Sequence, residues 1–233
     1  MQGHTTRAHI IFMREVIPKI NPDAVILLLG INDLGFSITK NSGNCGSPYD
    51  YYKPGWKSRF FFNSRLLQIL YKGGLVIFNQ IAVEKKGGPG EFRSKPLTDI
   101  PIILPNDLKI LLPCLNQYRE NVKEIIRLAK SMKTRIILLT QPSLFDDTPY
   151  WRGIEGEFYW VKNVKGKLSA ATHWKLLDIY NKELMEVCKD ENVECIDLAS
   201  LIPHSKLYFY DITHFNEKGA ELVAEKIIEF LKI

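Results

Sequence analysis

The chain has 233 residues, of which 45% are hydrophobic and 24% are charged, and its formal net charge is +5. This apolar fraction can fill a core, which excludes disorder as the overall state, and the length fits one large domain or one domain with an insertion. No run approaches the roughly 18 to 20 uncharged apolar residues of a membrane span, and no signal peptide is visible at the start. These features do not assign the protein to a cellular compartment.

Periodic segments predict alternating helices and strands. Apolar residues recur every three or four positions in four amphipathic segments, and Asn216 is a good N-cap for the last of them. These helices are expected at residues 6–20, 117–132, 173–188 and 217–231. Unbroken apolar runs bounded by turn signals predict strands buried on both faces, at residues 24–29, 135–140 and 193–198. Such alternation indicates a parallel sheet with helices on both faces.

A long segment, residues 36–113, interrupts this alternation. Connections normally run about 2–6 residues, so we predict a large insertion within a single domain spanning 1–233, with a helix near residues 63–71. Within it, residues 53–95 carry nine Lys or Arg and two Glu, a net charge of +7. A solvated loop explains this basic island best, followed by a surface for anionic lipid or polysaccharide; we do not expect nucleic-acid binding.

Four cysteines, at positions 45, 114, 188 and 195, are scattered along the chain. Their spacing is that of neither a metal-ligand cluster nor a redox pair. We therefore expect no metal site, and a disulfide framework is not indicated.

The strongest local signal is Gly30-Ile31-Asn32-Asp33, directly after a predicted buried strand. In open parallel sheets, ligands bind beyond the carboxyl ends of the strands, which is where Asn32 is expected. Its amide can donate a hydrogen bond to a developing oxyanion. A plain turn explains the same four residues, and Asp33 is expected to be a structural acceptor.

A second signal, Asp211-Ile212-Thr213-His214, precedes the last helix. At this spacing the carboxylate can accept the imidazole Nδ1–H, which leaves Nε2 free to act as a base. A surface histidine that caps the helix is the alternative. A third, weaker signal is Gly3, whose backbone N–H is either an oxyanion donor at a helix N-terminus or part of a capping turn.

Taken together and in this order, these motifs resemble the SGNH (GDSL-type) hydrolase superfamily, and FYDITHFNEKGAELVAEKI is similar to its fifth block and final helix. The resemblance implies a three-layer α/β/α sandwich with a flavodoxin-like parallel sheet. It implies Asp211 and His214 as acid and base, and Asn32 and Gly3 as oxyanion donors. It requires no metal or organic cofactor.

The family's nucleophile is a serine in a Gly-Asp-Ser block upstream of the Gly3 block, and this chain begins at the Gly3 block. We therefore expect that the N-terminal strands and the serine are missing, through a mis-set start or truncation, and that the chain is inactive as written. In the intact protein, the expected function is hydrolysis of small-molecule, glycan or lipid esters. The alternatives are a non-catalytic binding module for acylated or anionic ligands and, less favoured because no glycine-rich phosphate loop follows a strand, a nucleotide binder.

Overall fold

Three parallel strands form the sheet of this computed structural model, which describes residues 4–38, 45, 96, 112–156 and 168–232. They are β1 (Ala24–Leu28), β2 (Arg135–Leu139) and β3 (Glu194–Ile196), in the order β1-β2-β3. Ala24 pairs with Arg135, and Ile137 pairs with Glu194. All three predicted strands are confirmed, each within a few residues of its expected bounds.

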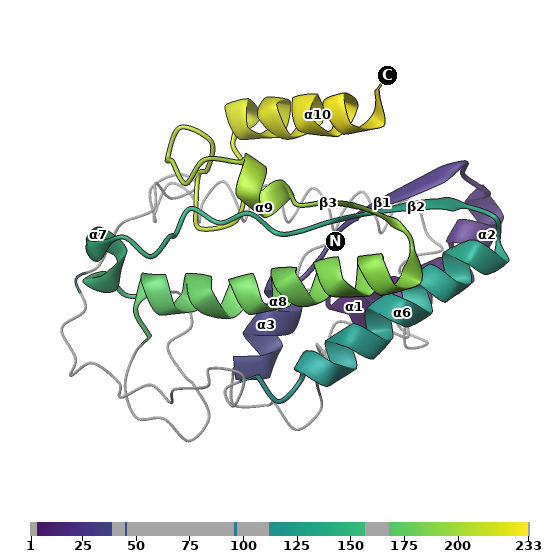
Figure 1. Ribbon diagram of the computed structural model, residues 1–233, viewed down its shortest axis with the longest axis horizontal. Helices are drawn as coiled ribbons and strands as arrows, with labels where there is room; N and C mark the ends of the chain where they lie inside the picture. The colour runs from purple at the N-terminus through teal and green to yellow at the C-terminus, as the bar shows by residue number, and fades with distance from the viewer. Residues whose placement is uncertain (1–3, 39–44, 46–95, 97–111, 157–167, 233) are drawn as a thin grey trace, which may run out of the picture.

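Helices cover both faces of this sheet (Figure 1). One face carries α1 (Thr6–Glu15), α6 (Leu115–Ser131) and α8 (Ala170–Glu191), and the other carries α9 (Leu198–Leu201) and α10 (Glu217–Leu231). Successive residues of β2 alternate between the two cores, with Ile136 and Leu138 facing α6 and α8, and Ile137 and Leu139 facing α9 and α10. This is the predicted α/β/α arrangement.

The first helix differs from the prediction, because it breaks at Val16 into α1 and the short α2 (Ile17–Ile20). Pro18 explains the break: it has no N–H to donate, and in a continuous helix its ring would clash with the carbonyl of Arg14. Three further short helices, α3 (Ile31–Ile38), α7 (Pro149–Arg152) and α9, were not predicted, and α9 begins at Leu198, where the third strand was expected to end.

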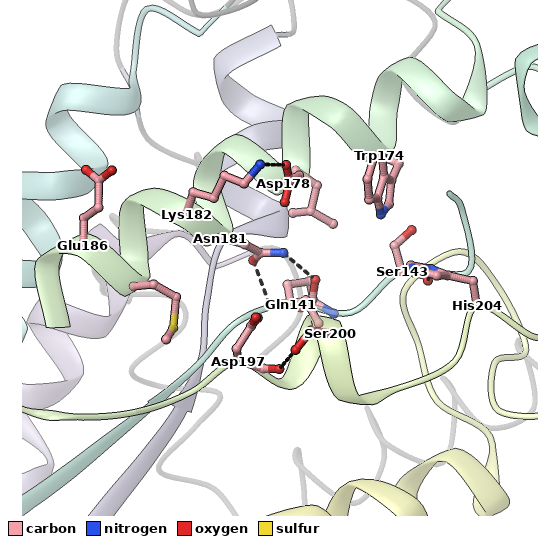
Figure 2. A pocket seen from close by; sticks show the side chains of 13 residues that line it. Gln141, Ser143, Trp174, Asp178, Asn181, Lys182, Glu186, Asp197, Ser200 and His204 are labelled. Atoms are coloured by element: carbon pink, nitrogen blue, oxygen red, sulfur yellow. Dashed lines mark hydrogen bonds and ion pairs between the residues drawn. The ribbon is translucent and has the colours of Figure 1, made fainter. Parts of the chain in front are cut away.

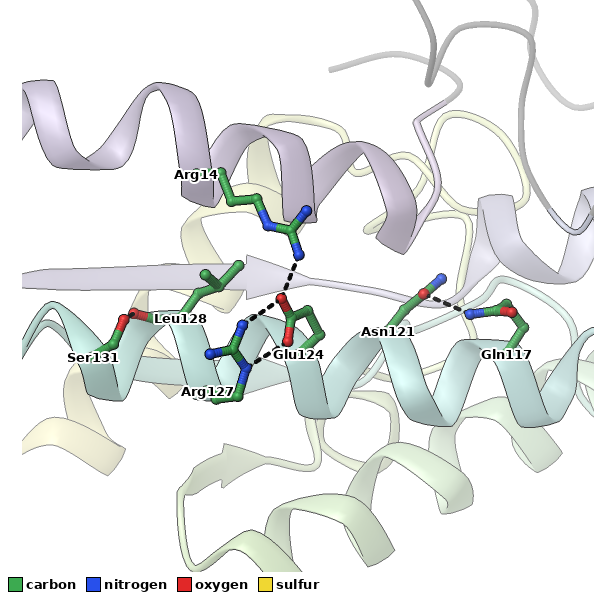
Figure 3. A network of polar contacts seen from close by, with 7 residues as sticks. All are labelled: Arg14, Gln117, Asn121, Glu124, Arg127, Leu128 and Ser131. Carbon is green, nitrogen blue, oxygen red and sulfur yellow. Dashed lines mark hydrogen bonds and ion pairs between the residues drawn. The ribbon is translucent and has the colours of Figure 1, made fainter.

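One ion pair joins α1 to α6 beside this break, and a second lies within α6 (Figure 3). Glu124 Oε1 lies 2.5 Å from Arg14 Nη2, and Glu124 Oε2 lies 2.7 Å from Arg127 Nε. Hydrogen bonds from Arg127 and then from Arg14 lower the pKa of Glu124 to about 2. The carboxylate therefore stays charged through most of the acidic range and ties the two helices together.

The strand β1 does not match the expectation of burial on both faces. Val25 and Leu27 are buried under the helices, but the side chains of Ile26 and Leu28 on the other face are 43% and 36% exposed. The reason is that α10 packs over β2 and β3 and, within the described residues, nothing pairs with the outer edge of β1. In the part of the chain that the structure describes, this edge has no paired strand, and the sheet face beside it is apolar at Ile26 and Leu28.

The cysteines also differ from the prediction, because the structure pairs all four in disulfides. Cys45 bonds Cys114 with a Cα–Cα distance of 5.2 Å, and Cys188 bonds Cys195 with a Cα–Cα distance of 6.1 Å. The second pair joins the end of α8 to β3, which the turn at Asn192 brings together. Such proximity depends on the fold and not on sequence spacing.

Most of the predicted insertion, including the basic island and the helix near residues 63–71, lies outside the described residues, so these remain predictions. At its start, α3 continues through Ile38, past the expected boundary at residue 36. Of the helices that the structure describes, none has the length and hydropathy of a membrane span.

Candidate active site

Asn32 lies in the first turn of α3, where a plain turn was the alternative. Gly30 adopts a φ of +122°, which side-chain-bearing residues rarely adopt, and this lets the chain leave β1 and enter the helix at once. The Nδ2 of Asn32 donates a hydrogen bond to the backbone carbonyl of His4 at 2.9 Å. This bond uses one of the two amide hydrogens and fixes the orientation of the group.

Asp33, the residue after Asn32, fixes the start of α3 against the start of α1. Its carboxylate is buried and accepts the backbone N–H of Thr6 at 3.1 Å and the Thr6 hydroxyl at 2.6 Å. Asn121 of α6 donates to the same hydroxyl at 3.0 Å, and Gln117 donates to the Asn121 oxygen, as Figure 3 shows. Asp33 is therefore a structural acceptor, as expected, and it joins the starts of α1 and α3 to α6.

Asp211 and His214 form the predicted pair. The imidazole Nδ1 lies 2.7 Å from Asp211 Oδ2, and Asp211 Oδ1 accepts the backbone N–H groups of Thr213 and His214 at 3.0 and 2.8 Å. Because an ionised carboxylate only accepts hydrogen bonds, Nδ1 is the donor to Asp211, and in the neutral imidazole Nε2 is then the acceptor nitrogen. The His214 side chain is 61% exposed, so the ring does not point into the core.

The loop that carries this pair is anchored on both sides. Ile212 is buried, and its carbonyl accepts the backbone N–H of Leu144 at 2.8 Å. Asn216 caps α10 by accepting the N–H of Gly219. A Cβ on Gly219 would lie 2.0 Å from the carbonyl oxygen of Tyr208, so only glycine lets the loop rest on the helix. The motif is therefore positioned by one buried apolar residue and one glycine.

Asn32, Asp211 and His214 line one cavity of about 690 Å³ beyond the carboxyl end of β1. His4 and His9 line it too. The fourth predicted site residue, Gly3, lies outside the described residues, so its position is not compared. Among the described lining residues of this cavity, none is a serine or a cysteine.

Two further residues shape the cavity. The Tyr210 ring stacks on the His214 ring, with centroids 5.5 Å apart and an interplanar angle of 11°. Sequence reasoning passed over Tyr210, although it directly precedes Asp211. Gln141 follows β2, and its Nε2 lies 3.4 Å from the carbonyl oxygen of Thr213. A position just after the carboxyl end of a parallel strand is the sequence signal that could have identified it.

The described residues do not provide a set of donors for a metal ion. Within residues 4–38, 112–156 and 168–232, no three His, Cys, Asp or Glu side chains are grouped so that they could hold an ion. What this cavity can provide is an oriented base and an amide donor. These are the protein groups that acyl transfer by a hydroxyl nucleophile requires.

The chain belongs to the GDSL-like lipase/acylhydrolase family, whose model matches residues 2–222. Its fold is that of solved SGNH-type esterases and hydrolases. One is LAE5, an α/β hydrolase enzyme from the metagenome of Lake Arreo, Spain, with a TM-score of 0.51 and 12% identity. Another is a catalytic mutant of Axe2, an acetylxylan esterase from Geobacillus stearothermophilus, with a TM-score of 0.50 and 12% identity.

Each comparison covers 97% of this chain and 67% of the other chain, so the 233 residues span about two thirds of the length of these enzymes. At 12% identity the likeness shows the fold alone. A search of curated proteins finds no match.

Proposed function

We propose that this chain carries the acid–base pair and an oxyanion donor of an SGNH-type serine esterase. The observation that supports this most is that Asn32 and the Asp211–His214 pair, which are about 180 residues apart in sequence, line the same cavity. The orientation of the imidazole adds to it, because Nδ1 is engaged by Asp211 and Nε2 is left to act as a base.

The nucleophile in this proposal is a serine outside the 233 residues, on a strand that pairs with the open edge of β1. The outer edge of β1, with which none of the described residues pairs, supports a further strand at this position. The carboxyl end of such a parallel strand would lie beside Gly30 and Asn32. Without that strand, the proposal makes the chain inactive.

The reaction follows from these positions. The serine Oγ attacks the ester carbonyl carbon while His214 Nε2 takes the hydroxyl proton. Asp211 holds the ring and stabilises the imidazolium. The second N–H of Asn32, with the backbone N–H of Gly3, donates to the oxyanion. The imidazolium then protonates the leaving alcohol. A water molecule, deprotonated by His214, attacks the acyl-serine, and the imidazolium returns this proton to the serine Oγ as the acid leaves.

The substrate class in this proposal is a small-molecule or carbohydrate ester. It is supported by family membership and by the acetylxylan esterase among the similar folds. A non-catalytic module that binds acylated or anionic ligands is the second candidate. It is favoured by the absence of a serine or cysteine among the described residues that line the cavity.

Hydrolysis of 4-nitrophenyl acetate tests the proposal. We expect the 233-residue chain to be inactive and to resist labelling by a fluorophosphonate serine probe. A longer polypeptide that extends upstream through the serine should be active, and His214→Ala should remove that activity. As a control, Lys206→Ala changes an exposed residue that does not line this cavity. Activity of the His214→Ala variant near the wild-type level, or stoichiometric labelling of the short chain, would contradict the proposal.

A further inference from the structure

A second cavity, of about 560 Å³, lies between one side of α8 and residues 197–204, which include α9 (Figure 2). Sites for small molecules typically measure about 300 to 1,000 Å³ and combine aromatic side chains with a few placed polar groups. The α8 residues that line it recur at helical spacing, from Trp174 through Asp178 and Lys182 to Glu186. Sequence analysis gave this side of α8 no function.

Two rings form one end of this cavity. Trp174 is half-buried, and its ring is nearly perpendicular to that of His204, with the centroids 6.2 Å apart. His204 Nδ1 lies 2.6 Å from the carbonyl oxygen of Ser143. Because a carbonyl only accepts hydrogen bonds, Nδ1 donates, and Nε2 is left as an acceptor. This end therefore offers an apolar ring surface beside a hydrogen-bond acceptor.

The floor of the cavity is rigid and polar. The backbone N–H of Gln141 donates to Asn181 Oδ1 at 2.9 Å, and Asn181 Nδ2 donates to the Gln141 carbonyl at 3.0 Å. Both residues are buried, and Figure 2 shows the two bonds side by side. Groups held in this way lose little conformational entropy when a ligand binds.

One wall carries an ion pair in which Lys182 Nζ lies 2.6 Å from Asp178 Oδ2. A ligand hydroxyl can donate to the carboxylate and accept from the ammonium, and such charge-assisted bonds are stronger than neutral ones. Asp197 and Ser200 offer further hydrogen-bonding groups on the opposite wall. The cavity thus presents donors and acceptors on two sides of an aromatic surface.

The charge of the cavity selects among ligands. Among the described residues that line the cavity, Asp178, Glu186 and Asp197 outnumber one cation, Lys182. This excess of negative charge disfavours phosphates, carboxylates and other anions, because like charges repel. A neutral ligand with many hydroxyl groups and an apolar ring face matches the lining. These are the properties of an uncharged sugar.

Gln141 lines both cavities, so the second one adjoins the candidate active site. We propose that this second cavity binds the neutral glycan part of a carbohydrate ester while the ester group lies beside His214. This assignment rests on the proposed function for the reaction, whereas the binding of sugar itself does not require hydrolysis.

Calorimetric titration of the 233-residue chain with xylotetraose tests the inference, with tetragalacturonate as the anionic counterpart. We expect saturable binding of xylotetraose and at least tenfold weaker binding of tetragalacturonate. Trp174→Leu should weaken xylotetraose binding at least tenfold. The control Tyr150→Leu removes an exposed aromatic residue that does not line the cavity and should leave the affinity unchanged.

Three results would overturn the inference: no saturable binding of xylotetraose, equal affinity of the wild type and Trp174→Leu, or tighter binding of tetragalacturonate. Because this titration involves no hydrolysis, its failure leaves the esterase chemistry standing. Conversely, an inactive longer polypeptide that still binds xylotetraose through Trp174 would contradict the esterase proposal and leave the sugar site standing.

Discussion

His173 makes the stability of the protein depend on pH. The residue lies near the start of α8, its side chain is 1% exposed, and its ring meets Phe145 edge-on at a centroid distance of 5.8 Å. Burial lowers its pKa from 6.5 to about 4, because the charged imidazolium loses its hydration in the core. His173 is therefore neutral in the folded protein at neutral pH.

The magnitude follows from the difference between the folded and unfolded pKa. Between about pH 6.5 and 4 the unfolded chain binds a proton at His173 that the folded chain does not, so acid favours unfolding. Each pH unit in this window is worth about 1.4 kcal/mol, so His173 accounts for a loss of roughly 3 kcal/mol across it. The stabilisation is complete above the unfolded pKa.

Urea unfolding at several pH values between about 7 and 4 measures this effect. We expect His173→Gln, which keeps a neutral polar side chain of similar size, to have a flatter dependence of the free energy of unfolding on pH. Leu207→Gln changes an exposed residue that does not titrate and should keep the wild-type dependence. If His173→Gln loses as much stability as the wild type over this range, the reasoning about burial is wrong.

Further substitutions test other contacts by urea unfolding. Glu124→Gln should cost about 1 kcal/mol at neutral pH, because the paired arginines are largely exposed. Since Arg127 and Arg14 lower the pKa of Glu124 to about 2, this stabilisation is lost as pH falls from about 4.5 towards 2. The variant should therefore lose less stability than the wild type over this range, and an equal loss in both would contradict the prediction. Cys114→Ala opens a disulfide that spans 69 residues and should cost about 2–4 kcal/mol under oxidising conditions. Reductant also breaks the Cys188–Cys195 bond, so it should destabilise the variant less than the wild type, and an equal loss in both would contradict the prediction. Asp33→Asn should cost about 2 kcal/mol by placing an amide against buried donors, and a neutral effect would remove its structural role.

The secondary structure was predictable where one local signal dominates. The apolar runs identified β1, β2 and β3, and Asn216 identified the start of α10. The break at Pro18 was also present in the sequence, but the amphipathic period of the segment masked it. The exposed face of β1 was not predictable, because burial depends on which elements pack over a strand and not on the strand itself.

The candidate site was predictable in part, because parallel strands bring their carboxyl ends to one edge of a sheet. Asn32 follows β1 directly, and this placed it on the expected side of the molecule. The stacking of Tyr210 and the cavity beside Trp174 depend on packing between distant segments. In the sequence, the polar residues on one side of α8 have the same spacing as those on any solvated helix face, so they did not indicate a cavity.

The central claim is that an ester oxyanion forms beside Asn32 while His214 acts as the general base for the serine. A crystal structure of the longer polypeptide, labelled at its serine with a fluorophosphonate, measures this directly. We expect the phosphoryl oxygen within about 3.1 Å of Asn32 Nδ2, and His214 Nε2 facing the serine oxygen. A phosphoryl oxygen bound by other donors, with Asn32 and His214 both distant from the adduct, would contradict the account.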